Sequence, residues 1–80
     1  MLNVNVEHIG ELAVVECEGS IVQSEAFKLR EAVTSQKDAR IVVIELSDVY
    51  AIEGGGLGML AFLQRWARDN NISVPAVQPV

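Results

Sequence analysis

The chain has 80 residues, half of them hydrophobic, and its formal net charge is -5 at pH 7. This length fits a single domain, residues 1–80, with a thin core. The negative charge disfavours non-specific binding to nucleic acid or to anionic lipid, because both depend on Lys and Arg. The apolar runs are far shorter than the roughly 20 residues of a membrane span, and the first residues do not resemble a signal peptide. With one cysteine and no internal disulfide, we expect a cytoplasmic protein.

The first 18 residues predict an antiparallel hairpin. Residues 2–7 alternate apolar and polar side chains with the period of a half-buried strand, and residues 12–18 do so again after a turn at Gly10. Cys17 falls on an apolar face and is expected to be a buried small hydrophobe. Gly19 is expected to end the second strand.

A first helix is predicted after Gly19, with Ser24 as its N-cap. Its core-facing side carries apolar residues at helical spacing, Val22, Ala26, Leu29 and Val33. The polar residues 34–40 end this helix and lead to the next strand.

Residues 41–60 organise the rest of the chain. The β-branched run Ile41-Val42-Val43-Ile44 predicts a strand covered on both faces, and a polar corner with three consecutive glycines follows it. Residues 57–69 predict a second helix, with Asn70 and Asn71 as its C-cap signal. Residues 72–77 are β-like, and Pro75 makes them an edge strand.

This order, strand–strand–helix–strand–helix–strand, predicts a small mixed four-stranded α/β sheet with helices packed on it. The order also resembles the STAS domain, the fold of bacterial anti-sigma factor antagonists. The resemblance covers nearly the whole chain and is carried by Gly19, by Glu45-Leu46-Ser47, and by the stretch from Ile52 to Leu60. In that family a strand ends in Asp-Leu-Ser, and a helix opens a few residues later with Asp-Ser-Ser/Ala-Gly-Leu, whose first serine is phosphorylated by the anti-sigma factor.

The sequence departs from the family pattern at the switch. Glu45 and Glu53 stand where the family has Asp, and Gly54 stands at the position of the phosphorylated serine. Glycine has no hydroxyl, so a phosphate cannot be added there to disrupt partner docking. Members of the family usually continue with a further C-terminal helix, which this sequence lacks. The resulting exposed apolar surface predicts a homo-oligomer, strand exchange or a permanent partner.

The glycine corner has three alternative interpretations. The glycines could allow a positive φ or a close approach of helix and sheet, they could form a partner-docking surface, or they could hold a phosphate or a nucleotide at the helix N-terminus. The third is the weakest, because no Lys, Ser or Thr follows the glycines and Glu53 would repel an anion. Asp48 and Glu53 are interpreted as solvated acids, and His8 as a surface residue without metal partners. No nucleophile and base can be paired, so we predict neither catalytic residues, nor a metal, nor a cofactor.

Met59, Phe62 and Trp66 lie on one margin of the second helix. They either pack against the first helix around Phe27 and Ala32 or form a partner face, for which Met and Trp are well suited. The predicted partner-binding residues are Ser47, Asp48, Glu53, Gly54, Gly55, Gly56, Leu57, Met59, Phe62 and Trp66.

The resemblance therefore implies a non-enzymatic, cytoplasmic interaction domain without the serine switch. Its partner would be a protein, with an anti-sigma factor of the serine-kinase type as the first candidate. Acidic side chains at Asp48 and Glu53 would favour a basic partner face. The alternatives are a STAS subunit of a transporter or signalling assembly, and a small-ligand or nucleotide-binding module.

Overall fold

The computed structural model describes residues 1–73 and 76–77. The hairpin strands β1 (Leu2–Ile9) and β2 (Leu12–Ile21) are followed by helix α1 (Ala26–Thr34), strand β3 (Ile41–Ile52), helix α2 (Gly55–Asp69) and the short strand β4 (Ala76–Val77). Strand β1 runs antiparallel to β2, whereas β2, β3 and β4 run parallel, in the spatial order β1-β2-β3-β4. The mixed α/β fold is the one predicted.

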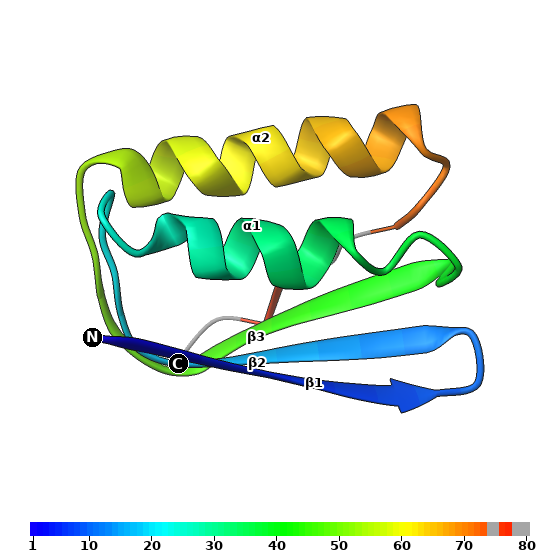
Figure 1. Cartoon of the computed structure of the whole chain (residues 1–80), viewed down its shortest axis with the longest axis horizontal. Coiled ribbons are helices and arrows are strands. Elements are labelled where there is room, and N and C mark those ends of the chain that lie inside the picture. The colour runs from blue at the N-terminus through cyan, green and yellow to red at the C-terminus, as the bar shows by residue number, and fades with distance from the viewer. Residues whose placement is uncertain (74–75, 78–80) are drawn as a thin grey trace.

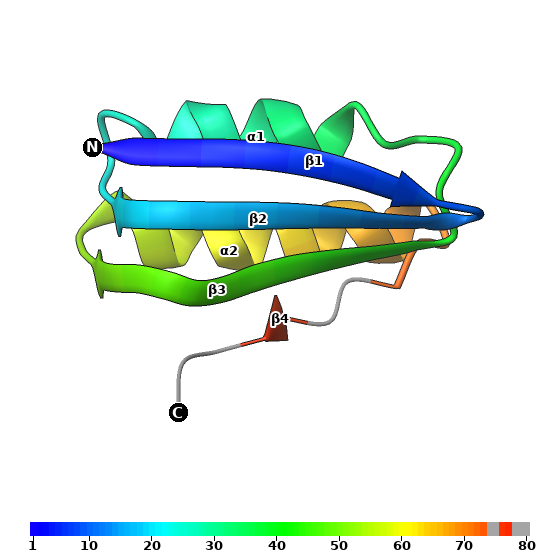
Figure 2. The ribbon, with the colours of Figure 1, turned by 90° about the horizontal axis from the view of Figure 1, so that it is seen from below.

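Both helices lie on the same side of the sheet (Figure 1). Seen from below, the strands lie in front of both helices, with no element over them (Figure 2). The described residues thus form two layers, with a helical face and an open sheet face. Neither described helix is long and apolar enough to cross a bilayer.

The core fills the space between the helices and the sheet. Alternation along the strands directs one set of side chains toward the helices, and each helix contributes one apolar face. The predicted core face of the hairpin is confirmed, and so is that of α1 at Ala26, Leu29 and Val33, whereas Val22 lies before the helix and is half-buried. The fully buried members are Leu2, Ala13, Val15, Ile21, Leu29, Val33, Val42, Ile44, Leu46 and Leu63.

The predicted double cover of the central strand is wrong. Ile41 is 42% exposed, and Val43 is only half-buried, because both face the open side of the sheet. The β-branched run reflects the strand preference of these side chains on a pleated surface and not burial on both sides.

The predicted ends of two strands were also too early. Gly19 lies inside β2, with a φ of 107°, and β3 extends through Ser47 and Asp48 to Ile52. Their pairing shifts register twice, each time with one extra residue in β3, as β-bulges do. The bulges let the polar segment remain in the sheet.

The start of α1 differs from the prediction, whereas the end of α2 agrees with it. Glu25 and not Ser24 is the N-cap of α1, and it makes no side-chain cap hydrogen bond. Asn70 and Asn71 do end α2: the Ile72 N–H reaches the Ala67 oxygen at 2.8 Å, and Asn71 has a φ of 57°. This is the Schellman arrangement. Pro75, on which the prediction of an edge strand rested, lies outside the described residues.

Candidate functional site: the corner between β3 and α2

The end of β2 supports the corner between β3 and α2. The Glu53 N–H donates to the Ile21 carbonyl oxygen at 3.0 Å, and the Gly56 N–H donates to the Glu53 oxygen at 3.0 Å. Ile21 is fully buried and pairs with Ile52. The start of α2 is therefore fixed to the sheet by backbone contacts that require no particular side chain.

The three glycines of the corner have different structural roles. Gly54 precedes α2 with φ 55° and ψ -123°, a conformation that L side chains rarely adopt. At Gly55 a Cβ would lie 3.0 Å from the Gln23 side chain, and at Gly56 it would lie 2.5 Å from the Ile21 oxygen. The structural interpretation of the glycines is thus confirmed at Gly54 and Gly56.

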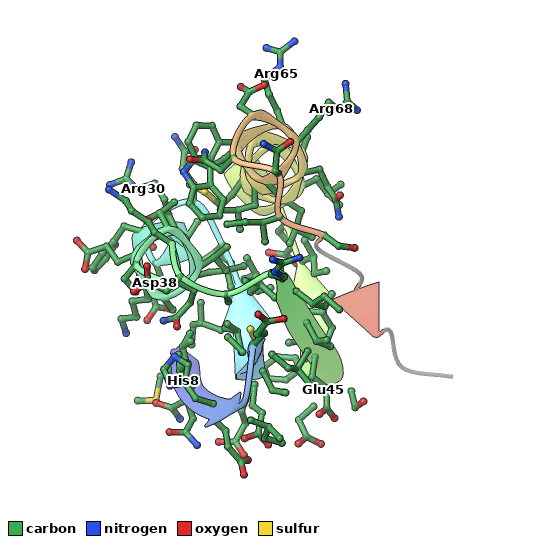
Figure 3. The ribbon with its side chains drawn as sticks, turned by 90° about the vertical axis from the view of Figure 1, so that its right-hand side faces the viewer. His8, Arg30, Asp38, Glu45, Arg65 and Arg68 are labelled. Carbon is green, nitrogen blue, oxygen red and sulfur yellow. The ribbon has the colours of Figure 1, made fainter. Side chains whose placement is uncertain are left out.

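Beyond the glycines, α2 presents an uncharged surface to solvent. Leu57 is 62% exposed and Phe62 is 47% exposed, with exposed Gly58 and Ala61 between them in sequence. Further along, Arg65 and Arg68 point away from the sheet (Figure 3). We call this exposed side of the helix the α2 outer face; it consists of the uncharged residues Leu57, Gly58, Ala61 and Phe62, followed by Arg65 and Arg68.

Met59 and Trp66 lie differently from Phe62. Both are half-buried and pack against the core, and Trp66 lines the same groove as Phe27 and Ala32. For these two residues the structure supports the first of the two alternatives, packing against the rest of the molecule, and their assignment as partner-binding residues stays a prediction. Phe62 is the member of the predicted trio that remains available to a partner.

Ser47 and Asp48 are not brought to the α2 outer face. Both are exposed within β3, and Asp48 pairs with Glu18 of β2, whose carboxylate accepts a hydrogen bond from Asn3 Nδ2 at 3.3 Å. The register places further acids of the open sheet face alongside, as in Figure 3, where Glu45 lies on the side opposite Arg65. These open-face acids are Glu7, Glu16, Glu18, Glu45 and Asp48.

The single cysteine and the single histidine of the chain are Cys17 and His8. Burial raises the pKa of the Cys17 thiol to about 11, so the thiol stays protonated and inert at neutral pH. His8 is exposed and contacts the side chain of Gln36. Within residues 1–73 and 76–77, no group of three His, Cys, Asp or Glu side chains is placed to hold a metal ion.

No protein-family model and no curated protein matches this chain. Solved structures do match. An anti-sigma factor antagonist from Mycobacterium paratuberculosis has a TM-score of 0.77 and 25% identity over 95% of this chain and 68% of that one. An antisigma-factor antagonist STAS domain from Rhodobacter sphaeroides has a TM-score of 0.81 and 17% identity over 95% of this chain and 85% of that one. This chain has a STAS-domain fold.

The STAS-like fold also matches a segment of a longer protein. The crystal structure of Mglu has a TM-score of 0.85 and 25% identity over 94% of this chain. This chain spans about a fifth of the length of Mglu, since it covers 19% of that chain. The same arrangement of strands and helices therefore occurs both in small antagonist proteins and within a larger chain.

The sequence did not single out three exposed residues near the corner. Gly58 and Ala61 are exposed between Leu57 and Phe62 in sequence, and Tyr50 near the end of β3 is 78% exposed. The exposure of Gly58 and Ala61 follows from the position of α2 on the sheet, and helical periodicity could have signalled it. Tyr50 is the extra residue of β3 at the register shift between Gly19 and Ser20, which no local sequence signal reveals.

Proposed function

We propose that this chain is a non-enzymatic protein-interaction domain that binds its partner through the α2 outer face and the corner at Glu53 and Gly54. The observation that carries the proposal is the uncharged start of α2, where Leu57 and Phe62 are exposed on either side of Gly58 and Ala61. Large apolar side chains in solvent, beside small residues that allow close approach, are typical of a protein interface.

The first candidate partner is an anti-sigma factor of the serine-kinase type. The STAS-domain fold and its likeness to antagonists support this choice. Gly54 occupies the position that the family resemblance assigns to the phosphorylated serine, so binding would persist without a phosphate switch. Arg65 and Arg68 beyond the uncharged surface favour a partner that offers carboxylates there.

The test is a calorimetric titration of the chain with the kinase-type anti-sigma factor of the same organism, in the presence of ATP. We expect saturable binding that Phe62→Ala weakens at least tenfold, because an exposed aromatic residue is removed from the contact. Incubation with the kinase should leave the chain unmodified. Phe27→Ala is the matched control, because Phe27 is 46% exposed against 47% for Phe62 but belongs to α1.

Equal binding by the wild type and Phe62→Ala would exclude docking on the α2 outer face. No binding to any such kinase would remove the anti-sigma factor as partner. Titration with nucleotides and inorganic phosphate addresses the ligand-binding alternative. Heat of binding that Gly58→Glu abolishes would favour that alternative over a protein partner.

A second candidate is a STAS module that docks within a larger assembly. The match to about a fifth of Mglu supports it, since this fold also occurs as one part of a longer chain. Size-exclusion chromatography of the native complex, followed by identification of its components, separates this role from that of a free antagonist.

A further inference from the structure

Strand β1 lies at one edge of the sheet, and its hydrogen bonds to β2 follow a fixed alternation. Leu2 pairs with Gly19, and the Ser20 N–H donates to the Met1 oxygen at 2.9 Å. In an antiparallel ladder this bond means that Met1 and every second residue after it bond to β2. The N–H and C=O groups of Leu2, Val4, Val6 and His8 therefore point outward, away from β2.

Helix α1 occupies only the first of these outward positions. The Leu2 N–H donates to Glu25 Oε1 at 3.3 Å, and Lys28 Nζ donates to the Leu2 oxygen at 3.3 Å. Among the described residues, nothing bonds to the outward backbone groups of Val4, Val6 and His8. Strand β1 also contains no Lys and no Pro, the residues with which proteins commonly block a free edge.

A groove runs beside this edge. Helix α1 lies beyond the outer margin of β1 when the sheet is seen from below (Figure 2). The groove beside β1 and α1 also includes Trp66 of α2 in its lining, and its whole volume is about 1070 Å³. Its walls include half-buried Val4 and Val6 of β1 and half-buried Ala32 of α1. The charged residues beside them are Lys28, Glu31 and Lys37. Apolar side chains that point from an added strand toward α1 would enter this space.

The position of α1 decides which kind of occupant fits. A second copy paired antiparallel along β1 would be related by a two-fold axis perpendicular to the sheet, so its own α1 would lie on the same side. Packed helices need 8–10 Å between axes, whereas neighbouring strands are about 4.8 Å apart. Two helices that both extend beyond the edge would overlap. An extended segment without a helix on that side has room.

The charges beside the edge define the chemistry of that segment. Side chains of an added strand alternate between the groove and the open sheet face. On the open face, the strands nearest this edge carry Glu7 of β1 with Glu16 and Glu18 of β2, and no Lys or Arg. A segment with apolar residues at the positions that face the groove, and Lys or Arg at the positions that face the open sheet side, would complement both surfaces.

We propose that the outer edge of β1 binds an extended peptide segment of alternating apolar and basic residues, which adds to the sheet as an antiparallel strand. Val4, Val6 and His8 supply the backbone hydrogen bonds, Val4, Val6 and Ala32 contact the apolar side chains, and the glutamates attract the basic ones. This site is separate from the α2 outer face, so either can fail without the other.

The test uses a capped nine-residue peptide of alternating valine and lysine, added to the full chain labelled with ¹⁵N. Hydrogen exchange of the Val4, Val6 and His8 amides should slow at least tenfold in the complex, because new hydrogen bonds protect them. The amides of Asn3 and Asn5 already bond to β2 and should change little. Unchanged exchange at Val4 and Val6 with saturating peptide would overturn the proposal.

Two matched controls separate strand addition from simple attraction to acidic residues. A peptide of the same composition, with its valines grouped at one end, should bind at least tenfold more weakly, and equal affinity would overturn the proposal. Ala32→Lys, which places a long cationic side chain in the groove, should weaken binding tenfold, whereas Ala61→Lys on exposed α2 should not. Should Ala32→Lys prove unfolded by circular dichroism, the grouped peptide and the exchange pattern still decide.

Discussion

A Cβ atom at Gly56 would lie 2.5 Å from the carbonyl oxygen of Ile21, and that same oxygen accepts the Glu53 N–H at 3.0 Å. The contact involves only backbone on the Ile21 side, so neither partner can yield by rotating a side chain. The absence of a Cβ at Gly56 is therefore what allows the start of α2 to lie so close to the end of β2.

Replacement of Gly56 by alanine should therefore destabilise the fold. We expect Gly56→Ala to lower the free energy of unfolding by about 1–3 kcal/mol, the usual cost of overpacking. Gly58→Ala is the matched control, because a Cβ at Gly58 meets nothing within 4 Å, and it should raise stability by about 0.5–1 kcal/mol. Urea unfolding of both variants measures the difference, and equal midpoints would contradict the close contact at Gly56.

A serine in place of Gly54 should destabilise the corner between β3 and α2. With φ 55° and ψ -123° at Gly54, Gly54→Ser should cost about 1–3 kcal/mol of backbone strain. A chemically synthesised chain with D-alanine at this position should be at least as stable as the wild type, since a D-residue favours positive φ. If serine and D-alanine proved equally stable in thermal unfolding, the positive φ would not be the constraint.

Glu25 should make stability depend on acid pH. Hydrogen bonds from Lys28 Nζ at 3.0 Å and from the Leu2 N–H lower the pKa of Glu25 to about 2 from its ordinary 4.5. The folded state thus binds this proton more weakly than the unfolded state. The contribution of Glu25 is fully present above about pH 4.5 and disappears as the pH falls toward about 2.

Glu25→Gln should accordingly lower the free energy of unfolding at pH 7 and weaken its dependence on pH between about pH 4.5 and 2. Urea midpoints measured across that range test this. Glu31→Gln, which removes an exposed carboxylate from α1, is the control for the loss of one negative charge. If the urea midpoints of wild type and Glu25→Gln changed identically with pH in this range, the contact with Lys28 would not favour the charged form of Glu25.

Asn71 should tolerate glycine better than a β-branched residue. Its φ of 57° ends α2 in the left-handed region, which costs a residue with a side chain roughly 1–2 kcal/mol. We expect Asn71→Gly to be neutral or slightly stabilising and Asn71→Val to lower the melting temperature by several degrees. A valine variant that melts with the wild type would mean that the helix end does not need this conformation.

Local sequence patterns predicted those elements whose conformation depends on the periodicity or the backbone preference of their own residues. The alternation of residues 2–7 and 12–18 gave the hairpin, and the spacing of Ala26, Leu29 and Val33 gave the buried face of α1. The asparagines that end α2 carry a local conformational preference, so they were also found from sequence.

The features that were missed depend on pairing between distant segments. Gly19 stays in β2, and β3 reaches Ile52, because the bulges in β3 keep the two strands paired. No local signal reveals an extra residue opposite a partner strand. Similarly, Asp48 and Glu53 are close in sequence, but only the register of β3 shows that Asp48 joins the open-face acids while Glu53 follows the strand end.

The two-layer architecture also distributes charge unevenly, because the helices carry charges of both signs whereas strands β1, β2 and β3 carry acids but no Lys or Arg. Arg30, Arg65 and Arg68 lie on the helical side and Glu45 on the opposite side (Figure 3), where Glu7, Glu16, Glu18 and Asp48 share the open sheet face with it. Such a separation gives the molecule an electric dipole that turns it before contact is made. Because the net charge is -5, a basic partner would be attracted and turned toward the open sheet face, and the rate of that encounter should fall as salt screens the field.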